Sequence, residues 1–168
     1  MRLIVSRALL LVLLFCLIFL FAFIEGAWHE QEMFVIVGNF LQVVIPGLGC
    51  YISLIRKDKI GVKQFVRTVL VTALITHAIK WATYHMNIGI RPSGGMKSFP
   101  SGHTSSSFQG ALFLSKRYGW KWGIPAIVLA SLAAYSRIYG QYHHWRDVIA
   151  GFLVALLVNK LFVTSRTP

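Results

Sequence analysis

The sequence predicts an all-α protein, an integral-membrane bundle of six transmembrane helices with both termini in the cytoplasm. Hydrophobic residues make up 56% of the 168 residues and charged residues only 13%, whereas about a quarter of the residues of a soluble domain are charged. Apolar runs recur along the whole chain with short connections, and they lack the alternation of barrel strands. We therefore expect a single domain over 1–168, without a separate soluble part.

The first expected helix covers 8–24, where 17 uncharged residues follow Arg2 and Arg7. Such a segment is either a signal peptide or a membrane span. We favour the span, because no small-x-small cleavage site follows it and further apolar runs lie downstream. The acidic residues that come next are interpreted as a solvated hairpin; they are Glu25, Glu30 and Glu32.

Five further helices are expected at 34–55, 64–83, 101–116, 122–140 and 146–163. Two of them depart from an ideal span. A Pro-Gly-Leu-Gly segment that starts at Pro46 interrupts the second helix, and we interpret it as a packing kink rather than a substrate portal. The fourth helix is short and opens with four hydroxyl-bearing residues, 104–107. Its start is therefore expected to face protein or water instead of lipid.

The basic residues predict the orientation of the bundle. Twelve of the 17 lysines and arginines fall on one side if the six helices alternate: Arg2, Arg7, Arg56, Lys57, Lys59, Lys63, Arg67, Lys116, Arg117, Lys121, Lys160 and Arg166. The positive-inside rule makes that side cytoplasmic. Five of the twelve belong to an expected loop at 56–67. The remaining bases lie at or near the external face: Lys80, Arg91, Lys97, Arg137 and Arg146. A net charge of +12 is compatible with binding to nucleic acid. The apolar runs that recur along the whole chain argue against nucleic acid as a partner.

One block of residues on the external face, 99–104, has the composition of an anion site. Ser101 is a good helix cap, and Gly102 allows a ligand to approach the backbone closely. The N–H groups of the helix that begins here would point at an anion, phosphate in particular. His103 would then exchange a proton beside that anion. The alternative is a capped helix with an incidental histidine.

A second block on this face combines Arg137, His143 and Asp147. Their spacing places the histidine and the carboxylate on one face of a helix. A carboxylate that holds one imidazole nitrogen leaves the other nitrogen as a nucleophile, and a guanidinium suits phosphate oxygens. An ordinary His–Asp contact at a helix start is the alternative. Lys80 and Arg91 would add two cations that stabilise phosphoryl transfer, unless Lys80 only extends to the membrane interface.

At these residues the sequence resembles the type 2 phosphatidic acid phosphatase superfamily, integral-membrane lipid phosphatases with the signature K-x6-R-P, P-S-G-H and S-R-x5-H-x3-D. The second element stands at 100–103 and the third at 136–147, both without change. The first element departs from the pattern, because ten residues separate Lys80 from Arg91 where the family usually has six. Tyr84 occupies the usual lysine position.

The resemblance implies a role for each residue of these motifs. His143 would attack phosphorus to form a phosphohistidine, and Asp147 would orient it. His103 would protonate the leaving oxygen and then activate water. The phosphoryl oxygens would be held by Lys80, Arg91, Ser101, Gly102 and Arg137. No cofactor or metal is expected, because a two-metal site needs several clustered carboxylates and this face offers only Asp147.

The resemblance further implies a lipid phosphatase of the bacterial inner membrane, with its active site on the external face. It would hydrolyse a phosphate or diphosphate monoester of a lipid in the bilayer. Candidate substrates are undecaprenyl diphosphate, phosphatidylglycerophosphate, phosphatidic acid and the phosphates of lipid A. A lipid phosphotransferase with the same intermediate and a small anion transporter remain alternatives. The sequence predicts no oligomeric state.

Overall fold

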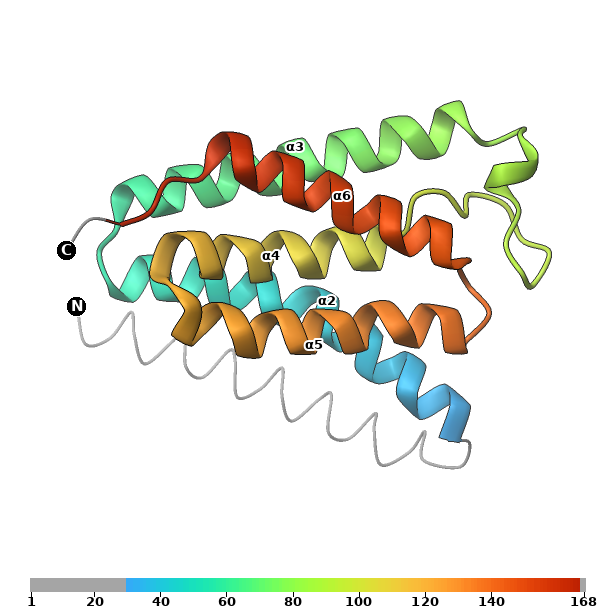
Figure 1. The fold of residues 1–168 in the computed structure, drawn as a ribbon, viewed down its shortest axis with the longest axis horizontal. Helices are drawn as coiled ribbons and strands as arrows, with labels where there is room; N and C mark the ends of the chain where they lie inside the picture. Colours follow the sequence, from blue (N-terminus) through green and yellow to red (C-terminus); the bar gives the residue numbers. More distant parts are fainter. Residues whose placement is uncertain (1–29, 167–168) are drawn as a thin grey trace.

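The computed structural model describes residues 30–166, and within this range it contains five α-helices, one short 3-10 helix and no strand. These are α2 (Glu30–Ile55), α3 (Lys59–Ala82), η1 (Asn87–Gly89), α4 (Gly102–Tyr118), α5 (Trp120–Tyr139) and α6 (Trp145–Phe162). Figure 1 shows the α-helices side by side in an elongated bundle. The all-α class is confirmed. The expected helix at 8–24 lies outside the described residues, so the six spans and the location of the termini stay predictions.

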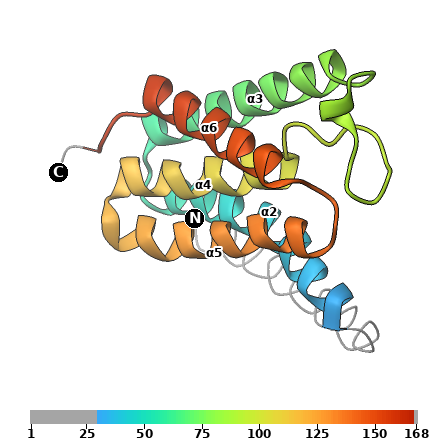
Figure 2. The same cartoon turned by 45° about the vertical axis from the view of Figure 1, so that its right-hand side comes forward.

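Helix α4 lies at the centre of the bundle. It contacts α2, α3, α5 and α6, and both Figure 1 and Figure 2 show it between α5 and α6. The hydroxyl-bearing residues Thr104, Ser105 and Ser107 at its start are buried, and Ser107 Oγ donates a hydrogen bond to His103 O (2.8 Å). The start of this helix therefore faces protein, as predicted.

Small side chains form the interior of the bundle, and large apolar side chains form much of its surface. Ala111, Ala130 and Ala155 are fully buried. Leucines on α3 and α6 are more than half exposed: Leu70, Leu74, Leu157 and Leu161. Helices that associate within a bilayer show this arrangement. Two segments of the described chain are long and apolar enough to cross a membrane, Glu32–Ile55 and Lys59–Ala82. The outer surface of the described helices is thus suited to contact with lipid.

Helix α2 is longer than predicted and continuous. It includes Glu30 and Glu32 in its first turn, so the predicted hairpin is wrong at these two positions; acidic residues are favoured at a helix N-terminus, where they face the positive end of the helix dipole. The helix also runs through Pro46 without a break. A Cβ atom on Gly110 of α4 would lie only 2.5 Å from Pro46 N. This close approach of α2 and α4 supports the interpretation of the Pro46 segment as a packing feature.

Helix α3 also begins earlier than predicted. Asp58 caps it, because its Oδ1 accepts a hydrogen bond from Gly61 N (2.8 Å), and the first helical residue is therefore Lys59 rather than residue 64. The predicted loop at 56–67 is thus confined to 56–58. The bases Lys59, Lys63 and Arg67 lie on the helix.

One end of the bundle, on the right in Figure 1, collects the C-terminal ends of α3 and α5 and the N-terminal ends of α4 and α6. The long connection at 83–101, which contains η1, and the short connection at 140–144 lie at this end. All eight predicted site residues belong to these helix ends and connections.

Candidate active site

A cavity of about 210 Å³ opens at this end of the bundle. Four of the eight predicted site residues line it, and they come from three distant stretches of the chain: Arg91, His103, Arg137 and His143. The other lining residues were not predicted: Val35, Asn39 and Tyr142. The two histidines therefore face one shared space together with two guanidinium groups.

Asp147 lies directly behind His143. Its carboxylate is fully buried, and Oδ2 is 3.6 Å from His143 Nδ1. The same oxygen accepts hydrogen bonds from Ser98 Oγ (2.5 Å) and from His144 N (2.9 Å). The second of these bonds is part of the capping box that begins α6. The carboxylate is thus fixed by the helix start, and because it faces Nδ1, the other ring nitrogen of His143, Nε2, is left for a ligand.

Burial makes the charged form of His143 unfavourable and lowers its pKa, and the positive charge of Lys80 lowers the pKa further, while Asp147 acts in the opposite direction. The side chain is only 4% exposed. His143 is therefore neutral at pH 7, which is the form of imidazole that acts as a nucleophile.

Asn39 on α2 links His103 to Arg137. Its Oδ1 accepts a hydrogen bond from Arg137 Nη1 (2.9 Å) and lies 2.9 Å from His103 Nε2. Because an amide oxygen only accepts hydrogen bonds, His103 Nε2 must be the donor and carry a proton. Arg137 also donates to Ser136 Oγ (3.0 Å) and to Val35 O. Asn39 was missed by the sequence analysis, although an amide within an apolar run is itself a signal of a functional position.

Arg91 reaches the cavity from the connection between α3 and α4. A tight turn holds it, since Arg91 N donates to Gly95 O (2.7 Å) and Gly94 N donates to Arg91 O (2.9 Å). The buried Nε of Arg91 has no hydrogen-bond partner in the structure. Tyr142 lies between the two arginines, with its ring centre 5.9 Å from Arg91 Cζ and 5.4 Å from Arg137 Cζ. Tyr142 thus contacts two cations that line the cavity.

Ser101 and Gly102 lie at the start of α4 but do not line this cavity. Ser101 is fully buried; its Oγ accepts hydrogen bonds from Thr104 Oγ1 (2.9 Å) and from Thr104 N (3.4 Å), and its N donates to Asp147 O (2.9 Å). The predicted helix cap is confirmed. Ser101 therefore joins the starts of α4 and α6.

Lys80 lies beside the cavity rather than in it. Its Nζ donates hydrogen bonds to Lys97 O (2.8 Å) and Ser98 O (3.3 Å), and its Cε would be 3.8 Å from a Cβ on Gly102. Lys80 therefore holds the connection that supplies Ser98, the serine that contacts Asp147. At the position where the signature has lysine, the ring of Tyr84 contacts Lys97 Nζ (5.4 Å).

A second cavity of about 340 Å³ shares His103 and Gly102 and extends between α2, α3 and α4. Polar side chains contribute to its wall, among them Thr72, Thr76 and Gln109. Thr72 Oγ1 is buried without a hydrogen-bond partner in the structure. His103 thus stands between a cationic cavity and a polar one.

Comparisons with known proteins agree with the motifs in the sequence. The sequence model of the PAP2 superfamily matches residues 8–167. The chain is 33% identical over 144 residues to a lipid A 1-phosphatase of Helicobacter pylori, a match that covers 81% of this chain and 74% of the relative. It is 32% identical over 152 residues to a lipid A 4'-phosphatase of the same species, with 86% and 74% covered.

The fold also resembles a solved structure. The crystal structure of Aquifex aeolicus LpxE superposes with a TM-score of 0.66 and covers 84% of this chain and 91% of its own. The identity between the two sequences is 23%, so this likeness concerns the fold.

Proposed function

The chain belongs to the PAP2 superfamily and is a phosphatase that acts on lipids. From this premise we propose that it hydrolyses a phosphate monoester of a lipid of the lipid A class. The similarity to lipid A phosphatases of Helicobacter pylori, over more than four fifths of the chain, supports this substrate class. The competing substrates are undecaprenyl diphosphate, phosphatidylglycerophosphate and phosphatidic acid.

The observation that carries the proposal is the shared cavity of His103 and His143, with Arg91 and Arg137 on its wall. A phosphoryl group in this space meets a neutral imidazole, a protonated imidazole nitrogen and two guanidinium groups at once. Phosphoryl transfer depends mainly on such positioning and on cations near the phosphoryl oxygens. No cluster of three metal-binding side chains occurs in the part of the chain that the structure describes, and the proposed reaction uses protein groups only.

In the first step, Nε2 of His143 attacks phosphorus and forms a P–N bond while the P–O bond to the lipid breaks. His103 enters this step as an imidazolium, gives one ring proton to the lipid oxygen that leaves and becomes neutral, so the lipid departs as an alcohol. Asp147 stabilises the positive charge that develops on the phosphorylated ring through its contact with Nδ1.

In the second step, a water molecule attacks phosphorus and His103 takes a proton from it. The P–N bond breaks, inorganic phosphate leaves, and His143 returns to its neutral form. Arg91, Arg137 and the backbone N–H groups at the start of α4 would hold the phosphoryl oxygens in both steps. Ser101 and Lys80 would act by positioning, because neither residue lines the cavity and their polar atoms bind other groups of the protein.

The proposed location of this site is the external face of the bacterial inner membrane. The opposite end of the described chain carries most of the basic residues, including Arg56, Lys63, Lys121 and Arg166, and the positive-inside rule assigns such an end to the cytoplasm.

Phosphate release by the purified protein tests the proposal. With EDTA present, we expect release from lipid A to exceed release from the three competing lipids. His143→Ala should abolish turnover, and Asp147→Asn should lower kcat by about 10²–10⁴-fold, as for a group that orients a catalytic imidazole. Unchanged turnover in His143→Ala would contradict the mechanism, and a preferred substrate other than lipid A would contradict the substrate class alone.

A further inference from the structure

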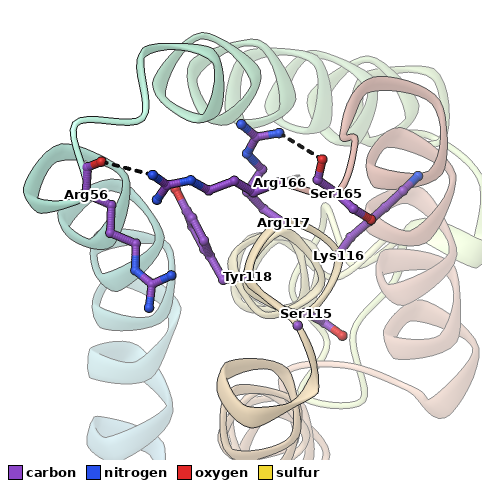
Figure 3. A pocket seen from close by; sticks show the side chains of 8 residues that line it. Arg56, Ser115, Lys116, Arg117, Tyr118, Ser165 and Arg166 are labelled. Carbon is purple, nitrogen blue, oxygen red and sulfur yellow. Dashed lines mark hydrogen bonds between the residues drawn. The ribbon is translucent and has the colours of Figure 1, made fainter. Parts of the chain in front are cut away.

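A larger cavity, of about 680 Å³, lies at the end of the bundle opposite the candidate active site. Its wall comes from three separate segments: Arg56 follows α2, Lys116 to Tyr118 end α4, and Ser165 and Arg166 follow α6. Figure 3 shows these side chains around the end of α4. Neither the proposed mechanism nor the sequence motifs involve this cavity.

One lining residue, Arg117, belongs to a buried ion pair. Arg117 donates to both carboxylate oxygens of Asp58, from Nε to Oδ2 and from Nη2 to Oδ1 (2.7 Å each), and Tyr118 OH donates to Oδ2 (3.0 Å). Arg117 holds the pKa of Asp58 well below its usual range. Asp58 is the only acidic residue at this end of the described chain, and its charge is balanced by Arg117.

Among the residues that the structure describes, three further cations of the cavity have only neutral partners. The guanidinium of Arg56 lies over the rings of Tyr118 (5.2 Å) and Trp122 (5.8 Å). Arg166 Nη2 donates to Arg56 O (3.4 Å), as Figure 3 shows. Lys116 Nζ donates to backbone oxygens near the end of α6, with the shorter bond to Lys160 O (2.9 Å). No carboxylate of the described chain pairs with these three groups, so they attract an anion.

The segment that carries Arg166 is held in place without a ligand. Arg166 N donates to Arg117 O (3.0 Å), and Arg117 Nη1 donates to Thr164 O (3.0 Å). Gln64 on α3 exchanges two hydrogen bonds with Thr164. Because these contacts fix the segment, an anion that binds here orders little additional chain.

We propose that this cavity binds the phosphate-bearing headgroup of an anionic phospholipid. The side chains on this end of the bundle favour an amphiphile over a soluble anion, because large apolar groups are exposed next to the cations: Leu54, Ile55, Ile60 and Trp120. Tryptophan is typical of the depth at which lipid headgroups lie, and basic cavities between helices at the cytoplasmic surface suit anionic headgroups.

Native mass spectrometry of the full chain in a neutral detergent tests the proposal. The probes are phosphatidylglycerol, phosphatidylcholine with the same acyl chains, and inorganic phosphate. We expect retention of phosphatidylglycerol over phosphatidylcholine and no displacement by millimolar phosphate. In the double variant Arg56→Gln/Arg166→Gln, binding should weaken about 30-fold, from about 1 kcal/mol for each basic side chain. Arg56→Lys/Arg166→Lys should retain most of the binding.

The matched control is Lys63→Gln/Lys121→Gln, which removes two exposed charges from the same end but outside the cavity. It should weaken binding by less than about threefold, because a specific site depends little on distant charges. Equal losses in the two glutamine double variants would overturn the proposal in favour of diffuse attraction, and displacement by phosphate would overturn it in favour of a soluble ligand. Phosphate release by each variant reports that it is folded, since its active site is intact.

Discussion

Asn39 Oδ1 accepts hydrogen bonds from both His103 Nε2 and Arg137 Nη1. This neutral side chain therefore favours a proton on Nε2 of His103. Asn39→Ala should lower kcat about tenfold, the effect of losing one hydrogen bond of about 1.4 kcal/mol, with a smaller effect on KM. Steady-state kinetics of phosphate release measures the changes in kcat and in KM separately. Gln42→Ala removes an amide one turn along α2 and serves as the control. Equal losses of kcat in both variants would contradict a specific role of Asn39.

Besides positioning the connection at 83–101, Lys80 affects the proposed nucleophile, His143, through its charge. The pKa of His143 lies below its ordinary value of about 6.5, and neutral imidazole predominates above that lowered pKa. The acidic limb of the pH profile of kcat/KM should therefore lie below pH 6.5. Lys80→Met removes one cause of the lowering and should move this limb to higher pH.

Lys97→Met is the control for that profile. Lys97 lies on the same connection, but its side chain contacts Tyr84, and its charge is not among the main causes of the lowered pKa of His143. A limb that stays in place in Lys80→Met, or that moves equally in Lys97→Met, would contradict the electrostatic effect of Lys80.

Among the elements, the crossing of α2 and α4 depends on a glycine, Gly110, which has no side chain to separate the two helices. A Cβ on Gly110 would lie 2.5 Å from Pro46 N, whereas a Cβ on Gly47 would meet nothing within 4 Å. Gly110→Ala should destabilise the protein by about 1–3 kcal/mol because backbone atoms must move apart. Gly47→Ala should be neutral or stabilise α2 by up to about 1 kcal/mol. Thermal unfolding in one detergent compares the two, and equal midpoints would contradict a close-packed crossing.

The presence of each described helix could be predicted from hydropathy, but the first residues of α2 and α3 were predicted less well. The ends of α4, α5 and α6 agree with the predicted runs within two residues. The start of α3 was missed because the first turns of the helix are basic, although Asp58 was a readable cap signal. Apolar runs report where a chain meets lipid, whereas a helix start depends on which group accepts its free N–H donors.

At the scale of the whole molecule, the two ends of the bundle differ in charge and in proposed function. We expect a membrane-impermeant maleimide to label Ser93→Cys in intact cells, and Lys121→Cys only after the membrane is opened, in a chain whose native cysteines are replaced. Both positions are exposed. Labelling of Lys121→Cys in intact cells would place the candidate active site in the cytoplasm and contradict the orientation.

The sequence motifs predicted which parts of the chain meet but not every residue that completes the site. The unchanged P-S-G-H and S-R-x5-H-x3-D elements placed His103, Arg137 and His143 on one cavity. Asn39 and Ser98 lie outside these elements, and their contacts arise only when α2 and the connection at 83–101 fold against α4 and α6. Such partners depend on tertiary packing, which spacing along one segment does not encode.

The distribution of large side chains on the outside and alanines on the inside also affects how stability varies with temperature. In a bilayer, the outward-facing leucines touch hydrocarbon whether or not the helices are associated, so separating the helices hydrates little apolar area. The heat capacity of unfolding should then be well below the usual value of about 12–15 cal/mol/K per residue. A small heat capacity gives a shallow stability curve, and cooling would weaken this bundle far less than it weakens a water-soluble one.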